Sequence, residues 1–167
     1  DGTVAAWLAA GTDWIESLFE QALHGVGRTP GLPVGAEVPA LGLARLDGGE
    51  TTVSQLVAGP TVVLFWNPGC GYCRAMHVDV RTWEAAPGEG APALVVVSAG
   101  ELEDVRAEGF ASPVLLDPDW VVAGAFGADG TPMAVLVDAE GRIGAPVVSG
   151  AVDALALLGA DALSSAD

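Results

Sequence analysis

The chain has 167 residues, of which 51% are hydrophobic, so it is long enough for one domain with a substantial core. It carries 22 acidic against six basic residues, all of them arginine, and its formal net charge is −16. This balance argues against nucleic acid and anionic membrane surfaces as partners, because both are bound mainly through clustered lysine and arginine. Genome composition or a saline habitat explains the acidity most simply; steering toward a basic partner is the alternative.

The N-terminal segment is predicted to be helical over residues 3–24. Asp13 and Glu16 are spaced as in a capping box, and apolar residues recur after them at helical spacing. The apolar run at residues 4–10 falls far short of the about 20 residues that a membrane helix needs. We interpret it as part of an amphipathic helix, with the remnant of a removed anchor as the alternative. Residues 28–39, rich in proline and glycine, predict an extended connector.

The rest of the sequence predicts strands that alternate with helices. Residues 41–53 are expected to form a hairpin around the turn DGGE, and residues 61–66 a strand buried on both faces. This order gives an α/β domain with a mixed sheet. The later elements are a helix at 70–86, a strand at 93–98, a short acidic helix at 101–108, a strand at 112–117, a helix at 119–126, a hairpin of strands 133–137 and 142–148, and a final helix at 152–158.

The two cysteines of the chain, Cys70 and Cys73, lie where the strand 61–66 gives way to the following helix. The first N–H groups of a helix have no intrahelical partner, and the helix dipole places partial positive charge there. A thiolate at Cys70 would be stabilised, and its pKa lowered. Cys73 lies one turn further along the same face, so it could attack a mixed disulfide at Cys70 and release the partner. The pattern predicts thiol–disulfide exchange in which Cys70 attacks and Cys73 resolves.

The segment FWNPGCGYC, which follows a hydrophobic strand, resembles the active-site segment of the thioredoxin-like superfamily, in particular the membrane-associated redoxins of the TlpA, ResA and MauD type. Three other segments agree with that family: the lead-in VGAEVPALGLARLDGGE, the insertion SPVLLDPDWVVAGAFGADGTP and the hairpin AVLVDAEGRI. The likeness covers about residues 34–158. It implies a thioredoxin-like fold, with a mixed central sheet flanked by helices and an N-terminal hairpin, to which this chain adds an N-terminal helix.

The resemblance also implies further residues of the site. The Thr131-Pro132 peptide bond is expected to be cis, with Pro132 beside the cysteines and the backbone of Thr131 free to pair with a partner's extended chain. Trp66 is expected to pack close to the cysteine pair and to take part in binding the partner. Gly71 and Tyr72, between the cysteines, are expected on the exposed tip of the helix, where they would contact the partner and influence the relative stability of thiolate and disulfide.

The sequence departs from the superfamily's pattern close to the cysteines. Thioredoxins usually carry tryptophan before the first cysteine, where this chain has Gly69, and a buried aspartate on the preceding strand, where it has Leu64. The ResA type has a glutamate at the position of Met76. Asn67 and His77 are the candidates for the proton-transfer role that these acids would have. The departures bear on the rate and direction of exchange, not on the presence of the dithiol.

The resulting prediction is a thiol-disulfide oxidoreductase that acts on the cysteine pairs of partner proteins and is recycled by a further redox partner. By resemblance the setting is extracytoplasmic and membrane-associated, with a tether outside this chain, and the task is the maturation of apo-cytochromes or dehydrogenase subunits. A cytoplasmic setting is the alternative. We expect residues 1–33 to be a helical extension and linker, residues 34–160 the redoxin domain, and residues 161–167 a flexible tail.

Three other functions fit parts of the pattern. Cys70, Cys73 and His77 form C-x2-C-x3-H, but structural zinc takes four ligands and the other histidine, His24, is remote, which leaves a two-thiolate copper(I) site as the metal alternative. We therefore expect no metal, and no cofactor besides a redox-active disulfide between the two cysteines. A peroxiredoxin-like peroxidase would need its cysteine in a loop rich in threonine and proline. A non-catalytic module of the same fold would hold an extended peptide in the groove around Pro132.

Overall fold

The computed structural model describes residues 31–159, so the helix predicted over residues 3–24 and the tail 161–167 lie outside the described residues. Within this part of the chain, seven strands form one mixed sheet in the order β2-β1-β5-β4-β3-β6-β7. The strands are β1 (Leu43–Arg45), β2 (Glu50–Thr51), β3 (Thr61–Trp66), β4 (Ala93–Ser98), β5 (Val114–Leu116), β6 (Met133–Val137) and β7 (Ile143–Ser149).

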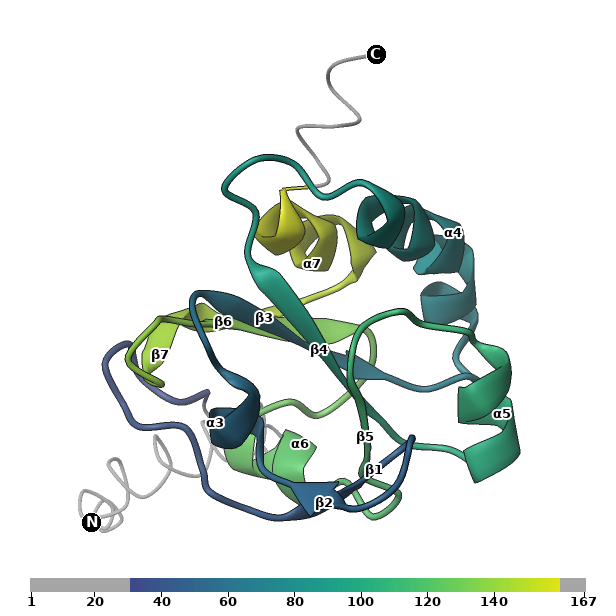
Figure 1. Ribbon diagram of the computed structural model, residues 1–167, viewed down its shortest axis with the longest axis horizontal. Coiled ribbons are helices and arrows are strands. Elements are labelled where there is room, and N and C mark those ends of the chain that lie inside the picture. Colours follow the sequence, from purple (N-terminus) through teal and green to yellow (C-terminus); the bar gives the residue numbers. More distant parts are fainter. Residues whose placement is uncertain (1–30, 160–167) are drawn as a thin grey trace, which may run out of the picture.

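Helices cover both faces of the sheet (Figure 1). The helices α4 (Gly71–Ala85) and α7 (Ala151–Leu158) pack side by side on one face, and the Trp83 indole N–H donates to the Leu158 carbonyl oxygen at 2.8 Å. The short helices α3 (Val53–Leu56) and α6 (Val121–Phe126) lie on the other face, and α5 (Leu102–Ala107) lies near the start of α4. No helix among the described residues is long and apolar enough to cross a bilayer.

The strand β3 is the centre of the core, as its uninterrupted apolar sequence predicts. All six of its residues are buried, because it pairs with β4 in parallel on one side and with β6 in antiparallel on the other. Its side chains alternate between two hydrophobic clusters, so that Phe65 packs with Phe126 on one face while Leu64 and Trp66 pack with α4 on the other. The rigid strand thereby fixes the position of the loop that follows it.

The predicted N-terminal hairpin is present but ends earlier than expected. The strands β1 and β2 pair Leu43 with Thr51, whereas Val53, assigned from the sequence to the second strand, begins the helix α3. The Thr52 hydroxyl accepts the Gln55 N–H at 3.1 Å, and the Gln55 carboxamide oxygen accepts the Thr52 N–H at 3.1 Å. This capping box outweighs the β-propensity of the TTV run, which had favoured a strand.

The topology gathers the loops of interest at one edge of the sheet. The strands β3, β4 and β5 are parallel, and their last residues are in register, Trp66 with Ser98 and Ser98 with Leu116. The loops that follow them therefore lie next to one another, as is usual at the carboxyl ends of parallel strands. The loop that leads into β6 reaches the same edge, because β6 runs antiparallel to β3.

Candidate active site

A tight turn places Cys70 at the start of α4. The Asn67 side-chain oxygen accepts the Gly69 N–H at 2.9 Å, and the Asn67 carbonyl oxygen accepts the Cys70 N–H at 2.9 Å. Cys70 is the N-cap residue: its backbone is extended and the helix begins at Gly71. Its thiol therefore lies beside the unpaired N–H groups of the first turn, as predicted.

The Cys70 thiol is partly exposed and is surrounded by hydrogen-bonding groups. Its Sγ lies 3.3 Å from the Thr131 carbonyl oxygen, which accepts the S–H of the neutral thiol. Partial burial opposes ionisation, but hydrogen bonds from the Thr131 side chain and from the backbone N–H groups of Cys73 and Tyr72 stabilise the thiolate more strongly. The pKa of Cys70 is therefore lowered from 9.0, which increases its thiolate fraction at neutral pH.

Cys73 has the opposite environment. Its side chain is fully buried among apolar residues, including Trp66 and Met76. Burial is the main reason that its pKa is raised to about 12, and the negative charge of a neighbouring Cys70 thiolate adds to the effect. Both cysteines are free thiols in this structure. The pair thus consists of one accessible sulfur that ionises readily and one protected sulfur that stays protonated.

The loop before β6 closes the site on one side. The Thr131-Pro132 peptide bond is cis, Pro132 is buried and Thr131 is partly exposed. Between the cysteines, Gly71 and Tyr72 are exposed, and Tyr72 is 75% accessible. Thr131 thus contacts the Cys70 sulfur through its carbonyl oxygen, and Gly71 and Tyr72 directly follow Cys70 in the chain.

Trp66 is placed differently from the prediction. It is fully buried in the same cluster as Cys73, so it packs beneath the cysteine pair. The sequence predicts that Trp66 also binds the partner, and this is wrong, because a fully buried side chain cannot contact one. Its indole N–H donates to the Glu108 carboxylate at 2.8 Å, and its ring packs edge-on against Phe110 with centroids 5.1 Å apart. Trp66 is the last residue of β3, so its buried ring fixes the start of the loop that carries Cys70.

Glu108, just beyond the end of α5, is the residue that the sequence reasoning missed. Its side chain is 13% exposed, its carboxylate lies 3.4 Å from His77 Nε2, and its backbone oxygen lies 2.8 Å from the same nitrogen. Together with the Trp66 bond, these contacts connect α5 to β3 and α4. No local pattern identifies Glu108, because it and Trp66 are 42 positions apart in the sequence.

The two candidates for proton transfer are both engaged elsewhere. The Asn67 side chain holds the turn before Cys70, and His77 faces Glu108. Leu64 and Met76, the two positions at which the sequence departs from the acids of the pattern it resembles, are buried and apolar. Within residues 31–159, no group of three or more His, Cys, Asp or Glu side chains is placed to hold a metal ion.

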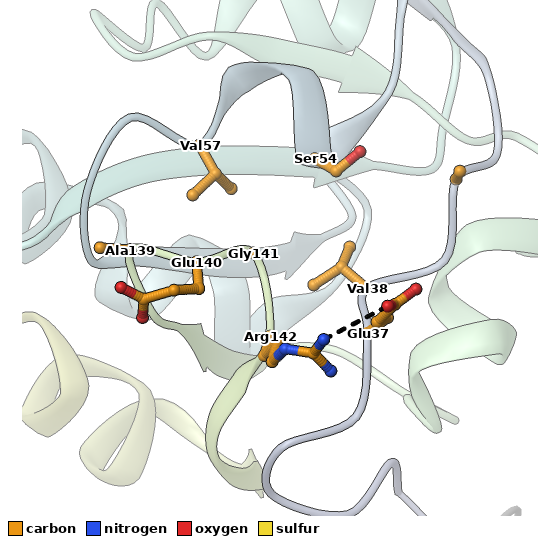
Figure 2. A pocket seen from close by; sticks show the side chains of 9 residues that line it. Glu37, Val38, Ser54, Val57, Ala139, Glu140, Gly141 and Arg142 are labelled. Carbon is orange, nitrogen blue, oxygen red and sulfur yellow. Dashed lines mark hydrogen bonds and ion pairs between the residues drawn. The ribbon is translucent and has the colours of Figure 1, made fainter.

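A hollow lies beside the turn between β6 and β7 (Figure 2). The last residue of β6 pairs with the first residue of β3, so this hollow is at the opposite end of the sheet from the cysteines. The segment before β1, the helix α3 and the turn between β6 and β7 surround it, and an ion pair between Arg142 and Glu37 at 3.4 Å lies on its rim. Ser54 is its one side-chain hydroxyl, and neither cysteine nor histidine lines it. The groups that thiol chemistry needs are therefore confined to the edge that carries Cys70.

Solved structures with the same fold include several thiol-disulfide proteins. The thioredoxin domain of a thiol-disulfide oxidoreductase from Bacteroides vulgatus is 24% identical with a TM-score of 0.59, over 80% of this chain and 97% of that chain. A thiol:disulfide interchange protein from a Bacteroides species is 24% identical with a TM-score of 0.61, over 80% of this chain and 90% of that chain. A secreted disulfide oxidoreductase from Mycobacterium tuberculosis is 21% identical with a TM-score of 0.60, over 74% and 96%. These likenesses establish a thioredoxin-like fold.

Comparison of sequences gives the family. No curated protein sequence matches the chain. The model of the Redoxin family matches residues 33–146. This stretch contains the hairpin of β1 and β2, both cysteines and the Thr131-Pro132 bond. Because this match covers well over half of the chain, the chain belongs to the Redoxin family.

Proposed function

We propose that this protein is a thiol-disulfide oxidoreductase that exchanges its Cys70–Cys73 dithiol with the cysteine pairs of partner proteins. The observation that carries the proposal is the contrast between the two thiols, one accessible with a lowered pKa and the other buried with a pKa raised to about 12. Exchange requires this contrast, because the attacking sulfur must be a thiolate, while the second sulfur must stay protonated until the mixed disulfide has formed.

The reaction has two steps. The Cys70 thiolate attacks one sulfur of the partner's disulfide, that bond breaks, and the other partner sulfur leaves as a thiolate that takes a proton from solvent. The Cys70 charge is then lost in the mixed disulfide, which removes one of the causes that raise the pKa of Cys73. Cys73 loses its proton and attacks Cys70 Sγ, so the second partner sulfur is released and the Cys70–Cys73 disulfide forms.

The loop at Thr131 and Pro132 is proposed to position the partner's chain. Thr131 is partly exposed and its carbonyl oxygen lies 3.3 Å from Cys70 Sγ, so a partner strand that pairs with this backbone would bring its own sulfur to Cys70. Tyr72 and Gly71, exposed on the other side of the sulfur, would contact the same chain. Trp66 would act from beneath, by holding the strand from which the loop begins.

Single-cysteine variants test the proposal. Wild-type protein should catalyse reduction of insulin by dithiothreitol, and Cys70→Ser should abolish it. Cys73→Ala should accumulate a mixed disulfide with a model partner, because the resolving sulfur is missing. Binding of a partner that survives in the double variant Cys70→Ser/Cys73→Ala, without any turnover in the wild type, would instead identify a non-catalytic peptide-binding module.

We also propose an extracytoplasmic setting, in which the protein serves cell-envelope proteins such as apo-cytochromes or dehydrogenase subunits. The secreted M. tuberculosis oxidoreductase with the same fold supports this setting. The unit that carries the reaction would be residues 34–160, with residues 1–33 as an extension. Fractionation of cells that produce the complete protein tests the setting: recovery with the cytosol would contradict it.

A further inference from the structure

A groove of about 420 Å³ lies beside the loop that carries Cys70. It is formed between this loop and α5, and it is lined by Pro68, Gly69, Arg74, Asp104, Ala107 and Glu108. The sheet order places this groove on the β4 side of β3, whereas Thr131 and Pro132 lead into β6 on the other side. The groove is therefore separate from the surface proposed to hold the partner's chain.

Gly69 leaves the groove open next to Cys70. The backbone of Gly69 does not lie in the left-handed region, and a Cβ at this position would meet only the Asn67 side-chain oxygen, at 3.4 Å. Neither conformation nor crowding thus requires a glycine here. The missing side chain is what leaves space directly before the reactive cysteine.

Two opposite charges line the groove without partners. Arg74 is in the first turn of α4 and Asp104 is in α5, and both are exposed. Neither side chain makes an ion pair or a hydrogen bond with another residue in the part of the chain that the structure describes. Glu108, in contrast, is held by Trp66 and His77, so it forms a fixed wall. The free groups complement a ligand that bears both a carboxylate and an ammonium group.

We infer that this groove is a subsite for the α-amino-acid head group of a low-molecular-weight disulfide, of which cystine is the simplest. Arg74 would bind the carboxylate and Asp104 the ammonium group, and the ligand's disulfide would extend past Gly69, which lines the groove and directly precedes Cys70 in the chain. The inference rests on the proposed exchange at Cys70, and it adds a small-molecule substrate class to it.

The reaction balances without another reagent. The Cys70 thiolate attacks one sulfur of cystine, the cystine S–S bond breaks, and one cysteine leaves as a thiolate that takes a proton from solvent. Cys73 then gives up its proton and attacks Cys70 Sγ, so the second cysteine leaves and is protonated. The protein dithiol is oxidised to the Cys70–Cys73 disulfide while cystine is reduced to two cysteines.

Four disulfides that differ in their charged groups test the inference on the complete, reduced protein: cystine, cystamine with ammonium groups only, dithiodipropionate with carboxylates only, and uncharged bis(hydroxyethyl) disulfide. Each single-turnover rate is divided by the rate with the uncharged disulfide, which removes any change in the reactivity of Cys70 itself. Arg74→Gln should lower the cystine and dithiodipropionate ratios about fivefold, the size of one partly exposed charge pair, and Asp104→Asn should lower the cystine and cystamine ratios about fivefold.

Two exposed charges of α5 that do not line the groove provide matched controls, Arg106→Gln and Glu103→Gln. They should leave all ratios at their wild-type values. Wild-type ratios in Arg74→Gln and Asp104→Asn, or equal losses in the controls, would overturn the inference, because only the overall charge would then matter. If the wild type reacts with none of the four disulfides, it is the exchange at Cys70 that fails, and the assignment of the groove fails with it.

Discussion

Replacement of Glu108 by alanine removes the side chain that connects α5 to the strand beneath the active site. The Trp66 indole is fully buried, and its bond to the carboxylate is 2.8 Å long. A hydrogen bond to a charged group contributes about 1.5–3 kcal/mol, and a buried donor left unpaired costs about 1–3 kcal/mol. The half-buried contact with His77 adds less than about 1 kcal/mol. Because the adjoining groove admits water to the vacated place, we expect a loss of about 2 kcal/mol in the free energy of unfolding.

Urea denaturation of the reduced protein measures this loss, and thermal unfolding should show a Tm lowered by about 4–8 °C. Glu108→Gln keeps an oxygen that can accept the indole N–H, so it should lose less than half as much. The control is Glu89→Ala, an exposed residue of the α4–β4 loop, which should stay within about 0.5 kcal/mol of the wild type. A loss in Glu108→Ala no larger than in Glu89→Ala would refute the reasoning.

Three further outcomes are expected. Asp117→Asn should lower the free energy of unfolding by about 1–2 kcal/mol, because the buried carboxylate accepts three N–H groups at the start of α6, while exposed Asp119→Asn should have no measurable effect. Thr131→Val should raise the pKa of Cys70, since a hydroxyl that stabilises the thiolate is lost; an unchanged pH profile of alkylation would contradict this. The reduced protein should lose stability as pH rises above 9.0, because folded Cys73, with a pKa of about 12, keeps a proton that the unfolded chain releases. The slope is at most about 1.4 kcal/mol per pH unit. This loss of stability with pH should be smaller in Cys73→Ala. The lowered pKa of Cys70 has the opposite effect: its contribution to the free energy of unfolding is stabilising and is complete above pH 9.0.

Much of the fold could be predicted from local sequence patterns. The apolar runs that become β3 and β4 are long, continuous and bounded by turn residues, so burial on both faces was the direct interpretation. The position of Cys70 followed from the same boundary, because a strand that ends in an Asn-Pro-Gly turn leaves the next residues to begin a helix. The error at α3 arose where two local signals competed, β-branched residues and a capping box, and the capping box prevailed.

The surroundings of the site could not be predicted in the same way. The contact between Trp66 and Glu108 depends on how α5 packs against the end of β3, which no spacing within the sequence reveals. The groove arises similarly: Gly69 was recognised as a departure from the usual tryptophan, but the unpaired charges of Arg74 and Asp104 line one groove only because α5 follows β4, the strand next to β3 in the sheet. Trp66 was misassigned to partner binding because the sequence gives its proximity to the cysteines but not the depth of its burial.

The rate of alkylation of each cysteine as a function of pH tests the central claim most directly. Reduced protein is treated with iodoacetamide, and mass spectrometry of its peptides distinguishes Cys70 from Cys73. Cys70 should react first, with an apparent pKa below 9.0, and Cys73 should stay unmodified until the pH nears its own pKa of about 12 or the protein unfolds. Equal reactivity of the two thiols, or earlier modification of Cys73, would contradict it.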